Sequence, residues 1–301
     1  MVDRIASHAQ SLTLASELMR LQSSYAKGQL QASSGLKSDN YQGIANSTQR
    51  LLSLESDYSH VTAQSENAQI ALDRVNGMYA AVQNMIDMVT SAQTMLSGAI
   101  SGGGLGQENL ETEAEQSRDS FVSSLNTQQA GRYLFGGGVT DTAPVDIDDV
   151  DYTVALPPST VDTAYYQGNG YIAKVQASDN LSVAYGITAD NSAFEKVLRA
   201  YNLMANNASD DIALQEAYEL LQEGFDGLNN MQTTLSNQAA ALDDQINRNA
   251  DDLNLLDNLI GDIKSVDLAE ITVKLATLET QLEASYSLTT KLLKLNLHDY
   301  L

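Results

Sequence analysis

The sequence predicts a mainly α protein with a small β-rich insert, in which long antiparallel helices are nested one pair inside another. Two observations support this prediction. Apolar residues recur in alternating steps of three and four over long stretches near both ends of the chain, which is the repeat of a coiled-coil seam. All three prolines fall between residues 144 and 158, so the stretches on either side can form uninterrupted helices.

The longest such stretch runs from Ile44 to Leu96. Of the sixteen positions reached by the alternating steps, thirteen are apolar or aromatic, and the exceptions are Ser47, Ser65 and Gln93. A stripe this long and narrow predicts one continuous helix that packs along its length against another helix. We expect it to be a structural element rather than the wall of an active site.

A second amphipathic helix is expected over residues 3–34. Its seam is formed by Leu14, Leu18, Leu21 and Tyr25, and further apolar residues are expected to widen it: Ile5, Leu12, Ala15 and Met19. The Ser33-Ser34-Gly35 sequence predicts the end of the helix. Because Ser and Gln interrupt the stripe, this helix would be marginally stable alone and needs a partner.

In the middle of the chain the sequence pattern changes from long helical repeats to shorter elements. Residues 101–104 predict a loop, and a third helix is expected over about residues 107–128. Glycines, prolines and alternating apolar residues then predict a small β module between residues 131 and 190. We expect its strands within residues 131–138, 152–154, 171–175 and 181–185.

Helical periodicity returns for the rest of the chain. Ser192 is the predicted N-cap of a short helix, and a second long helix is expected over residues 210–263. Its seam weakens at Gln238, Gln245, Asn249 and Asp252. Asp267 and Glu270 predict a capping box that opens a last helix. The seam of that helix is formed by Leu268, Ile271, Leu275, Leu278, Leu282 and Leu292.

The two terminal helices are expected to form a polymerisation seam. They can pair with each other, but a two-helix pair leaves much of its apolar surface in water. A seam residue gains about 1.5 to 3 kcal/mol only when it is fully buried, so we expect neighbouring copies to cover the remainder.

Composition excludes several classes of function. A net charge of −23 disfavours nucleic acid and anionic membranes as partners, and the absence of cysteine excludes disulfides and thiolate chemistry. The first twenty residues lack the basic and apolar regions of a cleaved signal peptide, and no stretch approaches the ~18 apolar residues of a membrane span. We therefore expect either a cytoplasmic protein or export without a cleaved signal.

No catalytic, cofactor or metal site is expected. His8, His60 and His298 lie far apart in the sequence, so they do not predict converging metal ligands. The acidic run over residues 141–151 lacks the spacing of a calcium loop, and the glycines of residues 102–106 follow a helix instead of the strand that precedes a phosphate loop. We interpret these groups as surface or packing residues of a protein that is not an enzyme.

Both ends of the chain resemble the flagellin superfamily. The C-terminal run Val266-Asp267-Leu268-Ala269-Glu270 and the closing residues 294–301 are similar to the flagellin C-terminus, and Ala32-Ser33-Ser34-Gly35 is similar to the end of the flagellin N-terminal helix. The resemblance implies a structural, extracellular subunit of the bacterial flagellum that forms a tubular homopolymer or ring. It also implies passage through the type III export apparatus with an export chaperone, and contact with neighbouring axial proteins, namely hook-associated proteins and flagellin.

One internal motif narrows the resemblance to the hook-filament junction branch of that superfamily. The motif consists of Gly131, Arg132, Tyr133, Leu134, Phe135 and Gly136. The resemblance implies a terminal coiled-coil domain over residues 1–36 and 266–301, a rod-like helical domain over 37–131 and 192–265, and a surface insert over 132–191. Filament flagellin is the alternative, followed by a cell-surface binding protein on the same scaffold and by a cytoplasmic coiled-coil signalling protein.

The sequence departs from the family pattern in two places. Many relatives carry an Asp-Asp pair after the first helix, where this chain has Ser38-Asp39-Asn40-Tyr41. Many filament flagellins carry arginines for an innate immune receptor in the long helix, at the positions of Asn84 and Ile86 here. The resemblance therefore implies weak or no recognition by that receptor.

Overall fold

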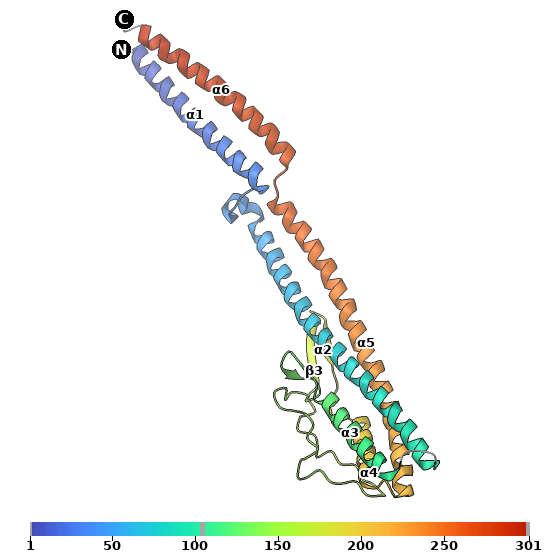
Figure 1. The fold of residues 1–301 in the computed structure, drawn as a ribbon. Coiled ribbons are helices and arrows are strands. Elements are labelled where there is room, and N and C mark those ends of the chain that lie inside the picture. Colours follow the sequence, from blue (N-terminus) through green and yellow to red (C-terminus); the bar gives the residue numbers. More distant parts are fainter. Residues whose placement is uncertain (1, 103–105, 299–301) are drawn as a thin grey trace. The chain divides into compact units, whose positions relative to one another are not determined.

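The structure, a computed structural model, describes residues 2–102 and 106–298 and is mainly helical, as predicted (Figure 1). Helices account for most of the described residues, and the strands form two small antiparallel sheets. The α-helices are α1 (Val2–Ser34), α2 (Thr48–Ile100), α3 (Gln107–Leu125), α4 (Ser192–Asn206), α5 (Asp211–Lys264) and α6 (Leu268–His298), with one 3₁₀ helix, η1 (Tyr41–Ser47). None of the described helices is long and apolar enough to cross a bilayer.

The long N-terminal stripe does not begin a helix where the sequence predicted. Ile44 lies inside η1 with φ −125° and ψ 30°, which is outside helical geometry, and α2 begins only at Thr48. The Asn40 side chain accepts a hydrogen bond from the Gly43 N–H, and the Thr48 hydroxyl donates to the Tyr41 carbonyl. These local polar bonds compete with helix formation and delay the start of α2.

Three further helix boundaries follow from local chemistry. Gly35 adopts φ +71°, a left-handed conformation that ends α1 after Ser34 as predicted. The N-cap of α4 is Asn191 and not Ser192, because the Asn191 Oδ1 atom accepts from the Ala193 N–H at 3.0 Å. At α6, Asp267 Oδ1 accepts from the backbone N–H groups of Ala269 and Glu270, which is the N-cap half of the predicted capping box.

The chain divides into two compact units. Unit 1 comprises residues 1–59 and 253–301, and unit 2 comprises residues 60–252. Both α2 and α5 contribute residues to each unit. The finer division into a terminal domain, a helical domain and an insert stays a prediction.

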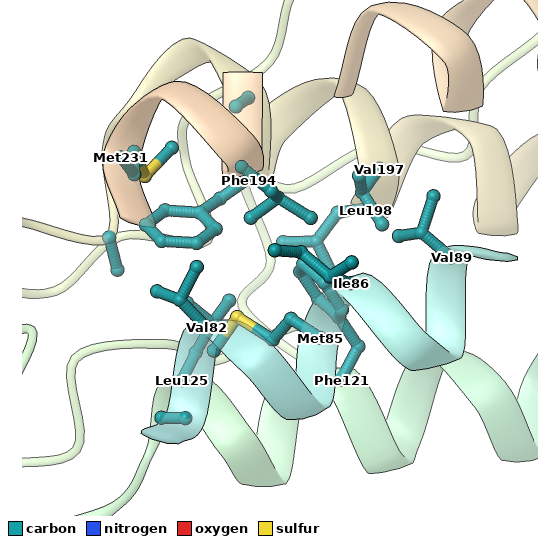
Figure 2. Packing of buried hydrophobic residues seen from close by; sticks show 14 of the residues in the cluster. Val82, Met85, Ile86, Val89, Phe121, Leu125, Phe194, Val197, Leu198 and Met231 are labelled. Atoms are coloured by element: carbon teal, nitrogen blue, oxygen red, sulfur yellow. The ribbon is translucent and has the colours of Figure 1, made fainter. Parts of the chain in front are cut away.

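The core of unit 2 collects side chains from four helices (Figure 2). Val82, Met85, Ile86 and Val89 of α2 face Phe121 and Leu125 of α3, with Phe194, Val197 and Leu198 of α4 and Met231 of α5 around them. The buried face of α2 is wider than the predicted seam and includes Ala71, Met78 and Ala92. The β region contributes to this cover as well as the helices, since an added Cβ atom at Gly186 would lie 3.1 Å from Met78 Cε. Tyr58 and Tyr79, which the sequence placed on the seam, are 38% exposed.

The structure has four strands in this region, as many as the sequence predicted, but they are not the same four. Strands β1 (Gln128–Gln129) and β2 (Arg132–Tyr133) form a hairpin whose turn residues, Ala130 and Gly131, both have positive φ. Residues 152–154 form no strand, because the N–H and hydroxyl groups of Thr153 bond to Asp162 while its carbonyl accepts from Asn202. The second sheet pairs β3 (Ala173–Ser178) with β4 (Leu181–Tyr185), and the latter agrees with the prediction.

The β3–β4 hairpin is anchored to polar residues of α2 and α5 within unit 2. Asn249, only 2% exposed, donates from Nδ2 to the Ala177 carbonyl at 3.0 Å, and Gln245 donates to Asn249 Oδ1 at 2.8 Å. At the hairpin turn, Gln64 Nε2 donates to Asp179 Oδ1 at 2.8 Å, and His60 Nε2 lies 2.8 Å from the same oxygen. At the weak seam positions of α5, Asn249 therefore binds the hairpin, and Gln245 holds the Asn249 side chain in place.

Candidate functional site

The candidate site is the pair of terminal helices, which lie side by side and antiparallel in unit 1 (Figure 1). They lie close together at Gly28, where an added Cβ atom would lie 2.9 Å from Leu275 Cδ2 and 3.6 Å from Ile271 Cδ1. Farther along the pair, Gln22 Nε2 donates to the Tyr286 hydroxyl at 2.7 Å. A glycine at the contact lets α6 pack its leucines against the backbone of α1.

The structure brings most of the predicted seam residues into this contact. Ile271, Leu278 and Leu282 of α6 are buried, with exposed fractions of 3%, 9% and 9%, while Leu275 is half-buried. The α1 residues are half-buried: Leu14, Leu18, Leu21 and Tyr25. Leu268 is 56% exposed, and the side chain of Leu292 lies outside the described residues. These residues pair α1 with α6 inside one chain, and their part in polymerisation stays a prediction.

A second set of apolar side chains on the same two helices faces solvent. We call it the outer stripe, and it consists of Leu12, Met19 and Leu30 on α1 and Val273 and Leu288 on α6, each more than half exposed. Leu12 and Met19 do not widen the seam as predicted. At about 100° per residue, Leu12, Met19 and Leu30 fall on one face of α1, well away from the face of Leu14, Leu18 and Leu21. The helices are thus apolar on two faces, and only one is covered.

The connector after α1 and the connector before α6 are held together by a set of contacts that we call the clasp. Leu36 and Ser265 form an antiparallel bridge, in which the Lys37 N–H donates to the Lys264 carbonyl at 2.7 Å and the Val266 N–H donates to the Gly35 carbonyl at 2.8 Å. Lys37 Nζ donates to the Asp262 and Ile263 carbonyls at the end of α5. A cation at the C-terminus of a helix satisfies free carbonyls and complements the helix dipole.

An ion pair completes the clasp. Lys264 Nζ bonds to Glu55 Oε1, and the Tyr41 hydroxyl donates to Glu55 Oε2 at 2.9 Å. The hydrogen bond from Lys264 lowers the pKa of Glu55, and the hydrogen bond to Glu55 raises the pKa of Tyr41. Sequence reasoning missed this clasp, because its members are separated by more than two hundred residues and none belongs to an apolar stripe.

The family-like motif at residues 131–136 is part of the core of unit 2. Leu134 and Phe135 are 2% and 0% exposed, and the Phe135 ring meets Phe194 edge to face with centroids 5.9 Å apart. At Gly136, an added Cβ atom would lie 2.2 Å from the Val139 carbonyl oxygen, so the close turn requires glycine. In this structure the motif therefore contributes two core side chains and a tight turn.

The structure describes only some of the groups considered for metal chemistry. Among the described residues, no group of three His, Cys, Asp or Glu side chains is placed to hold a metal ion. His60 contacts the hairpin turn, while the side chains of His8 and His298 lie outside the described residues. In the acidic run, Asp146 and Asp149 accept hydrogen bonds from the backbone N–H groups of Asp148 and Asp151, which shapes their own loop.

One cavity of about 170 Å³ is lined by residues 152–162 of the insert and by residues of α4. Its walls include the ion pair between Glu195 and Arg199, whose Nε and Oε1 atoms are 3.1 Å apart, and the buried amide of Asn202. Burial raises the pKa of Glu195, and the guanidinium of Arg199 opposes that shift. Glu195 and Asn202 accept hydrogen bonds from the N–H groups of Asp162 and Ala155, so they anchor the insert to α4.

Comparisons with known proteins agree with this architecture. No family model matches the sequence, and no curated protein matches it significantly. A solved structure of a flagellar hook-associated protein from Vibrio parahaemolyticus superposes with a TM-score of 0.58 at 17% identity, over 75% of this chain and 99% of that chain. The chain has the fold of a flagellar hook-associated protein.

Two further solved structures share this fold. FlgL of Bacillus cereus superposes with a TM-score of 0.53 at 17% identity, over 68% of this chain and 99% of that chain. Flagellar hook-associated protein 3 of Legionella pneumophila superposes with a TM-score of 0.55 at 11% identity, over 70% of this chain and 98% of that chain. The hook-associated fold is therefore retained at sequence identities far too low for the sequences to match.

Proposed function

We propose that this chain is a structural subunit of the bacterial flagellum that assembles with its own copies and with related axial proteins through α1 and α6. The observation that carries the proposal is the outer stripe: five large apolar side chains stand exposed on the two helices that already pair with each other. Its fold, shared with proteins named as flagellar hook-associated proteins, supports the same role. Such a role requires no catalysis and no cofactor.

The energy of the outer stripe favours many neighbours over one. Covering a half-exposed leucine or methionine yields roughly 1 to 2 kcal/mol, so the five residues together supply about 5 to 10 kcal/mol. Association costs about 4 to 15 kcal/mol in lost freedom and side-chain ordering. One pairwise contact is thus marginal, whereas a tubular polymer or ring, in which each copy has several neighbours, is stable.

Within this proposal the parts of the chain have separate tasks. Residues 1–36 and 266–301 form the polymerisation domain, residues 37–131 and 192–265 form the helical body, and residues 132–191 form an insert on the outer surface. Val150, which is 96% exposed within the insert, is not covered by the chain itself. The subunit is exported unfolded through the type III apparatus with an export chaperone and acts outside the cell.

The position in the flagellum that we propose is the junction between hook and filament. Deletion of the gene tests it: we expect bare hooks, with flagellin released into the medium. Antibody against the insert, viewed by negative-stain microscopy, should label one band next to the hook. Label along the whole fibre, or growth of the purified protein into long filaments, would instead assign the chain to filament flagellin.

We further propose that the innate immune receptor for flagellin recognises this chain weakly or not at all. Ile86 is 7% exposed in the core of unit 2, and Asn84 carries no charge, so neither offers an exposed cation on α2. Purified monomer applied to receptor-expressing reporter cells should give a signal near background. Robust activation would contradict this expectation and leave the structural role unaffected.

A further inference from the structure

The cavity between the insert and α4 contains a buried polar group without a hydrogen-bond partner. Arg199 lines this cavity, and its side chain is 11% exposed. Its Nε atom lies 3.1 Å from Glu195 Oε1 but makes no hydrogen bond to any of the described residues. A buried N–H group without a partner is unfavourable, so it marks a position where a bound molecule that accepts a hydrogen bond is stabilising.

The walls of the cavity are held in place by the protein itself. Glu216 of α5 accepts hydrogen bonds from the N–H and hydroxyl groups of Ser159, which lies within the lining segment. Asp162 accepts from the N–H and hydroxyl groups of Thr153, and the Asn202 amide donates to the Thr153 carbonyl at 3.3 Å. A site that is formed before its ligand arrives loses less conformational freedom on binding.

The lining combines polar and apolar parts. Asp162 and Glu195 supply carboxylate acceptors, and Arg199 supplies the donor. Val154 and Leu156 also line the cavity, and they are 56% and 64% exposed. Apolar walls with a few convergent polar groups are typical of sites for small molecules. A ring that carries hydroxyl groups suits both parts, because each hydroxyl both donates and accepts while the C–H face is apolar.

Charge and size narrow the class of ligand. The lining contains two carboxylates and one guanidinium, a net charge of −1, on a chain whose net charge is −23, so an anionic ligand is repelled. The free N–H of Arg199 needs an acceptor, which an ammonium group does not provide. The volume of about 170 Å³ is below the roughly 300 Å³ of the smallest drug-sized pockets, so the cavity suits one small ring.

We propose that this cavity binds a small neutral polyhydroxylated molecule, of the class of a single sugar ring or a polyol. Arg199 Nε donates to one hydroxyl oxygen of the ligand, Asp162 accepts from another hydroxyl, and Leu156 covers the apolar face. This binding is separate from assembly through α1 and α6, so either proposal can fail while the other stands.

The test is an NMR titration of the full chain, as dilute monomer, with glucose and with myo-inositol. We expect saturable shifts of the Arg199 Nε–H signal and of the amides of residues 153–162, with a Kd of about 1 mM or tighter. Glucuronate and glucosamine, which add a negative or a positive charge to a ring of similar size, should bind about tenfold less tightly. Absence of saturable shifts with both neutral probes, or glucuronate or glucosamine binding as tightly as glucose, would overturn the proposal.

Two variants locate the ligand in the cavity. Arg199→Lys keeps a positive charge beside Glu195 but removes the Nε–H donor, and it should weaken glucose binding about tenfold. Leu156→Ala should weaken it about threefold, whereas Val161→Ala, at a site 69% exposed and outside the lining, should have no effect. Circular dichroism checks that each variant is folded. Unchanged affinity in folded Arg199→Lys would overturn the site, and if that variant does not fold, unchanged affinity in Leu156→Ala would do so.

Discussion

The terminal helix pair and the core of unit 2 share one sequence pattern but bury it to different extents. In unit 2, Phe121, Phe194 and Tyr201 are completely buried in a core to which α2 to α5 and the segment of Leu134 and Phe135 all contribute. In the terminal pair, Ile271 is the most buried of the described apolar side chains, at 3% exposure, while Leu30 and Val273 are both 69% exposed on the same helices. The three-four repeat therefore specifies a helix and one packing face, whereas the number of neighbours decides how much of the helix is buried.

The largest expected effect tests the core side of this comparison. Phe194 is fully buried and meets the rings of both Phe121 and Phe135, so Phe194→Ala should lower the free energy of unfolding by about 3 to 5 kcal/mol. Chemical denaturation followed by circular dichroism measures it. The control Tyr171→Ala, at a site 60% exposed, should stay within about 0.5 kcal/mol of the unchanged chain. Equal losses for both would contradict the account of the core.

A smaller effect is expected where polar residues interrupt the core of unit 2. Asn249→Ala leaves the buried Ala177 carbonyl without its donor, which should cost about 1 to 3 kcal/mol. We expect faster amide exchange in β3 and β4, with protection in α3 and α4 retained. The control Asn258→Ala, on the exposed face of α5, should leave the hairpin unchanged.

The ion pair of the clasp should contribute less to stability than either the aromatic core or the Asn249 hydrogen bond. Glu55 and Lys264 are partly exposed, with side-chain exposures of 27% and 38%, so their pair should be worth about 0.2 to 1 kcal/mol. A double-mutant cycle with Glu55→Gln and Lys264→Gln, scored by the rate of proteolysis within residues 35–47, isolates that coupling. A coupling of zero would show that the backbone bridge between Leu36 and Ser265 holds the connectors alone.

The smallest effect is a dependence on pH at the hairpin turn. Hydrogen bonds, first from His60 and then from Gln64, hold the pKa of Asp179 below its ordinary value of 3.8. A carboxyl group with a lowered pKa stabilises the fold above its ordinary pKa, and that contribution is lost as pH falls through the lowered value. Amide chemical shifts of residues 178–181 should therefore titrate below pH 3.8. They should be flat in Asp179→Asn.

Much of the helical architecture was predictable, because apolar periodicity reports directly on one buried face. The ends of α1, α5 and α6 agree with the sequence prediction within a few residues. The start of α2 differs from the prediction, because local hydrogen bonds of the Asn40 and Thr48 side chains determine it and apolar periodicity does not reveal such bonds. Residues 152–154 form no strand for a similar reason, since the backbone N–H and carbonyl groups of Thr153 bond to the side chains of Asp162 and Asn202.

The sequence predicted that the candidate site lies in the terminal helices, but it did not predict which of their apolar side chains face solvent. Periodicity selects the seam of Leu14, Leu18 and Leu21, and the structure places it against α6. The outer stripe carries a periodic signal too, because Leu12, Met19 and Leu30 are spaced by seven and eleven residues and fall on one face of a helix, but the sequence analysis merged Leu12 and Met19 with the seam. The pairing of α1 with α6 shows that these residues stay exposed. The clasp and the polar anchor at Asn249 likewise depend on contacts between distant segments.

Amide hydrogen exchange of the same protein in two states tests the central claim most directly. In dilute monomer, we expect α1 and α6 to exchange rapidly while the residues of α2 to α5 within unit 2 stay protected. After assembly, α1 and α6 should become as protected as the core. Terminal helices that are already as protected as the core in dilute monomer would contradict the claim that they need other copies for full burial.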